Sequence, residues 1–155
     1  MSNLARTRFT ESEYLNQERI AEEKHEYLNG EIRAMGSASA RHNLITVNIL
    51  TYLRQALKGT ACRPFPGDMR LKVTASGLYT YPDVMVVCDK PEFSGEKPDT
   101  LTNPKMIVEV LSTSTEAYDR GKKFAYYRRL PSLVPWAILS TKNCLKHLKQ
   151  KVRGN

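Results

Sequence analysis

The sequence has no apolar run that approaches the roughly 18 residues needed to cross a membrane. The first residues, Met1 to Arg6, also lack the apolar stretch of a secretion signal. We therefore expect a cytoplasmic protein with no membrane partner. Intrinsic disorder is excluded as well, because 41% hydrophobic and 26% charged residues are close to the averages of globular domains.

Cysteine is scarce, with three residues and no C-x-x-C pair: Cys62, Cys88 and Cys144. An odd number at wide spacing is poor evidence for a disulfide framework or a zinc site, so we interpret all three as small apolar residues. A chain of 155 residues can bury a core without such crosslinks. The sequence has no internal repeat, which favours a single domain over residues 10–148 and a basic tail over residues 149–155.

Acidic residues are outnumbered, since 24 Lys and Arg against 16 Asp and Glu give a formal net charge of +8. Such an excess attracts polyanions, nucleic acid first among them. Several of the cations form a C-terminal run, namely Lys142, Lys146, Lys149, Lys151 and Arg153. A run of this kind is usually a solvated end. The charge therefore favours a nucleic-acid partner only modestly.

Local signals predict a mixture of helices and strands. Thr10 and Glu13 have the capping-box spacing of a helix start, and Asn29-Gly30 is a strong hairpin signal. The run Val84 to Val87 is typical of a strand buried on both faces. The pattern predicts an α+β, or α/β-like, fold with a central mixed β-sheet of about five strands flanked by helices. The predicted elements are a helix over residues 11–23, a hairpin over 26–35, a helix over 38–58, strands over 62–74, 79–88 and 106–111, a helix from a second capping box at 113–116 to 130, and short strands over 136–139 and 145–148.

Two carboxylates interrupt the two most apolar strands, Asp83 in one and Glu109 in the other. Burying a carboxylate without a partner is very costly, so a bound cation is the simplest reason for these residues. Pro82 cannot donate a ladder hydrogen bond, so its strand begins, bulges or lies at an edge here. If the strands are neighbours with aligned faces, the two carboxylates converge on Mg²⁺ or Mn²⁺, with the backbone carbonyl of Val110 as a further ligand.

A structural role for the same acids is an equally weighted alternative. Asp83 could cap a turn, or could pair with Arg70 or Lys72 on the neighbouring strand. Glu109 could be neutralised by a lysine in the core. On these residues alone, a metal site and a structural ion pair explain the pattern equally well.

A lysine on the following helix would complete a phosphodiesterase site. Lys123 shares a helix face with Arg120, three residues before it, and Tyr127, four residues after it. All three could reach one cleft beside Glu109. The ordinary alternative is a surface pair between Lys123 and Asp119, worth only tenths of a kcal/mol.

Three motifs in this order resemble a bacterial family of restriction-endonuclease-like proteins of unknown function, numerous in cyanobacteria, with the PD-(D/E)XK nuclease fold. The motifs are Tyr81-Pro82-Asp83-Val84, Val108-Glu109-Val110-Leu111-Ser112 and Thr115-Glu116-Ala117-Tyr118-Asp119-Arg120-Gly121-Lys122-Lys123-Phe124. The segments 26–32 and 41–42 also resemble the opening hairpin and the start of the long helix of the family. The resemblance covers roughly residues 10–148.

The resemblance implies a nuclease that holds Mg²⁺ or Mn²⁺ between Asp83 and Glu109 and acts on nucleic acid, with DNA expected, as a homodimer. Leu111 stands where the family fold places its lysine, and Lys123 is the match from the following helix, ahead of Lys122. Auxiliary acids are expected at Glu26 and Glu31. We interpret His42 as a core or supporting histidine.

Three departures from the family pattern keep rival functions open. Asn29 replaces an aspartate, Val134-Pro135 replaces a polar pair, and the chain ends at Asn155, before the usual final strands and helix. A partner subunit is one way to complete this edge. The rivals are a nucleic-acid-binding module without turnover and a purely structural or regulatory dimer.

Overall fold

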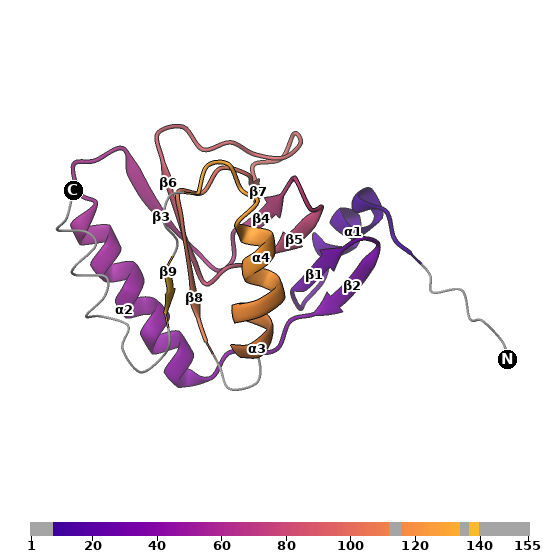
Figure 1. Ribbon diagram of the computed structural model, residues 1–155, viewed down its shortest axis with the longest axis horizontal. Coiled ribbons are helices and arrows are strands. Elements are labelled where there is room, and N and C mark those ends of the chain that lie inside the picture. The colour runs from indigo at the N-terminus through magenta and orange to yellow at the C-terminus, as the bar shows by residue number, and fades with distance from the viewer. Residues whose placement is uncertain (1–7, 112–115, 134–136, 140–155) are drawn as a thin grey trace, which may run out of the picture.

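A computed structural model describes residues 8–111, 116–133 and 137–139, and these form an α+β fold with helices around two β-sheets (Figure 1). The predicted class is confirmed. A mixed sheet of five strands is present, and a second sheet of four strands was not predicted. None of the helices in the described ranges is long and apolar enough to cross a membrane.

The first sheet contains the predicted hairpin over residues 26–35 and a second antiparallel pair, β4 and β5. Its order is β2 (Glu31–Ala34), β1 (His25–Leu28), β5 (Leu78–Thr80), β4 (Arg70–Val73) and β7 (Thr100–Leu101). The strands pair antiparallel except for β4 and β7, which are parallel. The predicted hairpin at Asn29-Gly30 is confirmed, with positive φ angles of 51° and 88° at its two turn residues.

The second sheet carries the two strands that the acids interrupt. Its order is β3 (Cys62–Pro66), β6 (Val84–Cys88), β8 (Met106–Val110) and β9 (Ala137–Leu139). The strands β6 and β8 are antiparallel neighbours, and Val84 pairs with Val108. The adjacency assumed for the two strands is therefore confirmed.

Helices lie on both sides of the second sheet (Figure 1). One side is covered by α2 (Ala40–Ala56), and the other faces α3 (Glu116–Tyr118), the π-helical turn η1 (Asp119–Lys123) and α4 (Phe124–Tyr127). The helix α1 (Glu11–Glu18) begins at the predicted capping box, where the Glu13 amide donates to Thr10 Oγ1. It ends before residue 23 because the Glu18 side chain turns inward and accepts from the His25 amide at 2.8 Å.

Two predicted long strands each break into two. The chain turns between Pro66 and Met69, where the Met69 amide donates to the Pro66 carbonyl, and it leaves the ladder again before Val84. The halves then join different sheets. The segment between β6 and β8 contains the short strand β7, with Leu101 fully buried. The second capping box, the strand over 145–148 and the basic tail lie outside the described residues.

A disulfide joins Cys62 and Cys88 across β3 and β6. The interpretation of these two residues as unbridged apolar side chains is wrong. They are 26 residues apart, and only the antiparallel register places them directly opposite each other. Cys144 lies outside the described residues.

Apolar residues alternate between two cores across the second sheet. Val84, Val86, Val108 and Val110 pack with α2, whereas Met85, Val87 and Ile107 pack with Tyr127 and Leu130 on the opposite face. This confirms that the run from Val84 to Val87 is buried on both faces. The alternation places Glu109 on the face of Ile107, toward α4.

Candidate active site

Glu109 is buried on β8, with 5% of its surface exposed. The Tyr127 hydroxyl donates to Glu109 Oε1 at 2.5 Å, and Lys123 Nζ lies 3.1 Å from the same oxygen. Burial and the adjacent Glu109 carboxylate raise the pKa of Tyr127 well above its usual value, which keeps the phenol protonated as a donor. The predicted shared face of Lys123 and Tyr127 is thus confirmed.

Lys123 lies between two carboxylates. Its ammonium is 3.0 Å from Glu26 Oε1 as well as 3.1 Å from Glu109 Oε1, and only 4% of the residue is exposed. Lys123 is therefore buried and not a solvent-exposed side chain. The Asp119 side chain lies outside the described part of the chain.

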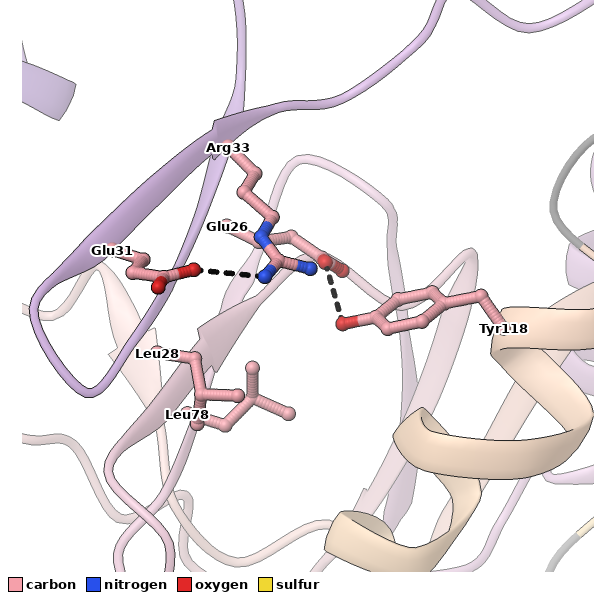
Figure 2. A pocket seen from close by; sticks show the side chains of 6 residues that line it. All are labelled: Glu26, Leu28, Glu31, Arg33, Leu78 and Tyr118. Carbon is pink, nitrogen blue, oxygen red and sulfur yellow. Dashed lines mark hydrogen bonds and ion pairs between the residues drawn. The ribbon is translucent and has the colours of Figure 1, made fainter. Parts of the chain in front are cut away.

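Glu26, on β1, is held by donors from three elements. Thr80 Oγ1 donates to Glu26 Oε1 at 2.5 Å, and the Tyr118 hydroxyl donates to Oε2 at 3.1 Å (Figure 2). Burial opposes ionisation of Glu26, but the Lys123 ammonium and these hydrogen bonds outweigh it, so the pKa of Glu26 lies below its usual value. The carboxylate is therefore charged at neutral pH.

The π-helical turn explains how one helix supplies three of these contacts. Tyr118 and Lys123 are five residues apart, and five residues overshoot an α-helical turn by about 140°. The π turn over Asp119–Lys123 uses i→i+5 hydrogen bonding, which aligns residues at that spacing. The α-helical spacing of four then adds Tyr127. Both Tyr118 and Lys123 consequently reach Glu26, while Lys123 and Tyr127 reach Glu109.

Asp83 lies immediately before β6, at the end of the second sheet. The Val110 amide donates to Asp83 Oδ2 at 2.7 Å, and His42 Nε2 lies 2.7 Å from Asp83 Oδ1. Because Val84 pairs with Val108, extending the register by one residue sets Asp83 opposite Glu109.

The alternative partners proposed for Asp83 are engaged elsewhere. Arg70 donates from Nε to the Tyr81 hydroxyl at 3.0 Å, and Lys72 pairs with Glu11 at 2.8 Å. His42 instead contacts Asp83 from the first turn of α2, which Ser39 caps. This contact agrees with the interpretation of His42 as a supporting histidine.

Glu31, Lys122 and Arg120 are the remaining predicted residues. Glu31 accepts from Arg33 at 2.8 Å. With Glu26 and Tyr118 it lines a pocket that two leucines also line (Figure 2). Lys122 is exposed, unlike Lys123. Nothing is described of the Arg120 side chain.

A sequence model of the Uma2 family, described as "Putative restriction endonuclease", matches residues 11–152. The chain belongs to this family. Two Synechocystis relatives, uncharacterized proteins sll1609 and slr1290, are each 40% identical to it, over 130 and 129 residues. The matches cover 84% and 83% of this chain, and 73% and 67% of the relatives.

A crystal structure of a "putative nuclease" from Anabaena variabilis shares the Uma2 fold. The TM-score is 0.69 at 20% identity, and the match covers 85% of this chain and 74% of the other. At this identity the likeness shows the fold alone. It confirms a nuclease-like fold for the chain, and proteins with this restriction-endonuclease-like fold generally use divalent metal ions.

Asp83, Glu109 and the Val110 carbonyl are the oxygen donors predicted for a hard cation. In the described ranges, no three His, Cys, Asp or Glu side chains are grouped to hold a metal, so the protein alone does not form a full cage there. Each Asp83 oxygen receives one of the hydrogen bonds above, which leaves lone pairs for an ion, and 22% of its side chain is exposed. Two carboxylates and the Val110 carbonyl, completed by water, suit Mg²⁺ or Mn²⁺.

Thr80 and Tyr118 donate hydrogen bonds to Glu26, and neither residue was predicted. Thr80 directly precedes the Tyr81-Pro82-Asp83 motif, so its position beside that motif was the available signal. Tyr118 lies five residues before Lys123, which is the wrong spacing for a shared face in an α-helix. Only the π turn reveals its contribution.

Proposed function

We propose that this protein is a metal-dependent nuclease that hydrolyses phosphodiester bonds in nucleic acid, with DNA as the first substrate to test. The observation that supports this proposal best is the buried Lys123 ammonium, 3.1 Å from Glu109 on the strand next to Asp83. The proposed hydrolysis requires two acids and a lysine. Here the following helix supplies the lysine, because Leu111 occupies the position where the family fold places it.

Each residue has a distinct task in this proposal. Asp83, Glu109 and the Val110 carbonyl would hold Mg²⁺ or Mn²⁺, which supplies Lewis acidity and lowers the pKa of a bound water. Lys123 orients the attacking water and offsets negative charge that develops on the phosphate. His42 fixes the Asp83 carboxylate, and Tyr127 fixes that of Glu109.

The direct test is cleavage of supercoiled plasmid and of a labelled RNA, with Mg²⁺, with Mn²⁺ and with a chelator. We expect cleavage with either metal and none with chelator. Asp83→Asn should slow cleavage by at least about ten-fold, because an amide binds the ion less well and cannot accept from His42 and Val110 equally. Asp89→Asn is the matched control, since Asp89 is exposed at the far end of β6 and its φ of 61° suits asparagine.

Equal cleavage by Asp83→Asn and Asp89→Asn would exclude Asp83 from the site. If the wild-type chain cleaves neither DNA nor RNA, a non-catalytic nucleic-acid-binding or dimeric module is the better proposal. One observation favours that module: Lys123 already neutralises charge on both buried acids, so the cluster has a structural explanation without turnover. A cytoplasmic location and a homodimer remain predictions under either proposal.

Binding to nucleic acid should depend strongly on salt. The net charge of +8 favours contacts with phosphates, and each contact releases counterions. We expect weak, sequence-independent affinity for a labelled duplex that falls by about ten-fold or more between 50 and 200 mM salt. Fluorescence anisotropy at several salt concentrations measures it. Affinity that ignores salt, or no binding at the lowest salt, would contradict a nucleic-acid partner.

A further inference from the structure

We propose that Tyr118 is a positioning residue that holds the Glu26 carboxylate and, through it, the Lys123 ammonium against Glu109. The kinetic part of this inference rests on the proposed nuclease function, whereas the placement of Lys123 can be tested without it. The inference also gives Glu26 a role different from that of an auxiliary metal ligand.

Lys123 needs such a support because its side chain is a flexible four-carbon stem with a point charge at the end. A contact with Glu109 alone would leave the ammonium free to move around one carboxylate oxygen. The second contact, at 3.0 Å to Glu26 Oε1, fixes it between β1 and β8. The position of Lys123 is then only as well defined as that of Glu26.

Glu26 is fixed from two opposite sides. Thr80 on β5 donates to Oε1, the same oxygen that faces Lys123, and Tyr118 on α3 donates to Oε2. Tyr118 is thus the group that sets the rotation of the carboxylate about its long axis. With three donors on two oxygens, Glu26 is committed to protein groups, which favours lysine positioning over metal binding.

The π turn ties this support to the helix that carries Lys123. Without the extra residue in the turn, Tyr118 would face about 140° away from Lys123. With it, Tyr118 and Lys123 meet the same carboxylate. Turns of this kind are energetically poor and are frequently kept at functional sites. Here the π turn brings the Tyr118 hydroxyl to Glu26, and this contact is a functional reason for keeping the turn.

The test compares Tyr118→Phe with Tyr126→Phe. Both changes delete one hydroxyl from the same helical segment. The Tyr126 ring, however, packs against the apolar core that contains Tyr127 and Leu130. In metal-free protein, acetylation of Lys123 is followed by peptide mass spectrometry, with exposed Lys122 as an internal reference. We expect Lys123 to react slowly in the wild type and in Tyr126→Phe, and about five-fold faster or more in Tyr118→Phe through local opening.

The kinetic arm measures plasmid cleavage. Tyr118→Phe should lower kcat by about ten-fold with KM unchanged, because substrate binding does not involve Tyr118 whereas Lys123 acts in the chemical step. Thr80→Val removes the donor on the other side of Glu26 and should also speed Lys123 acetylation, so it substitutes if Tyr118→Phe does not fold.

Equal Lys123 reactivity in Tyr118→Phe, Tyr126→Phe and the wild type would overturn the inference, even if the wild type cleaves DNA. Faster Lys123 acetylation in Tyr118→Phe supports the positioning role, even if the wild type cleaves nothing and the nuclease proposal fails. The two proposals therefore fail separately.

Discussion

Replacing Lys123 by methionine should reduce metal-dependent cleavage to background and lower the free energy of unfolding by about 3–5 kcal/mol. Methionine keeps most of the apolar stem but removes the charge that Glu26 and Glu109 share. Both acids are buried, with 11% and 7% of their side chains exposed, so water cannot replace the missing cation. A surface pair of Lys123 would contribute only tenths of a kcal/mol to stability, and the burial of the cluster changes that expectation.

Lys122→Met is the matched control for this substitution. Lys122 is the adjacent residue in the same turn and is exposed, so the change should alter the free energy of unfolding by less than about 0.5 kcal/mol. Urea unfolding and plasmid cleavage with Mg²⁺ are measured on both variants and the wild type. Cleavage by Lys123→Met at the wild-type rate would exclude Lys123 from catalysis.

The destabilisation by Lys123→Met should also depend on pH. In the wild type the pKa of Glu26 is lowered, so its charged form contributes stability above the unfolded pKa and that stability is lost as the pH falls. In the variant, burial without a cation raises the pKa of the acids, so they destabilise the fold as the pH rises. The difference between variant and wild type should therefore be larger at pH 8 than at pH 4. A difference that does not vary with pH would point to poorer packing instead of a missing charge.

Signals that act within a few residues were sufficient for the local structure. Thr10 and Glu13 set the start of α1, and Asn29-Gly30 set the first hairpin, because capping and turn chemistry depend only on neighbouring residues. The apolar runs likewise identified β6 and β8. The end of α1 was missed because it depends on Glu18 turning toward His25 and Tyr81, which come later in the chain.

Partners that are distant in the chain could not be predicted. The division into two sheets depends on which strand halves pair, and β3 and β6 pair across a segment that sends β4 and β5 to the other sheet. The disulfide between Cys62 and Cys88 depends on that same register. The pattern within one strand does not identify a partner strand that is distant in the chain.

In the candidate site, too, the features that depend on local sequence were predictable, and the contacts between distant residues were not. Asp83 and Glu109 were identifiable because acids in apolar strands violate the usual pattern of burial. Lys123 and Tyr127 were identifiable by α-helical spacing. The contact of Lys123 with Glu26, on a strand near the other end of the chain, and the π turn that adds Tyr118 are products of the folded arrangement. Resemblance drew attention to Glu26 without indicating which group it binds.

Exchange of the two carboxylates beside Lys123 should separate the metal ligand from the positioning residue. Glu109→Gln and Glu26→Gln are the same isosteric change, and each leaves Lys123 with the other of these two carboxylates. Glu109→Gln should lower the affinity for Mn²⁺ by at least about 100-fold, because it removes a charged ligand and not merely a supporting group. Glu26→Gln should change that affinity by less than about ten-fold while still slowing cleavage.

Isothermal titration calorimetry with Mn²⁺ measures both affinities, and thermal unfolding shows whether the two variants are comparably folded. Because each variant removes one negative charge and one ion pair with Lys123, a difference between their affinities identifies the acid that binds the ion. If Glu26→Gln weakens Mn²⁺ binding as much as Glu109→Gln, Glu26 is a ligand and its positioning role is wrong. If neither variant weakens binding, the ion is held elsewhere, and the buried acids and Lys123 form an ion cluster whose contribution is to stability alone.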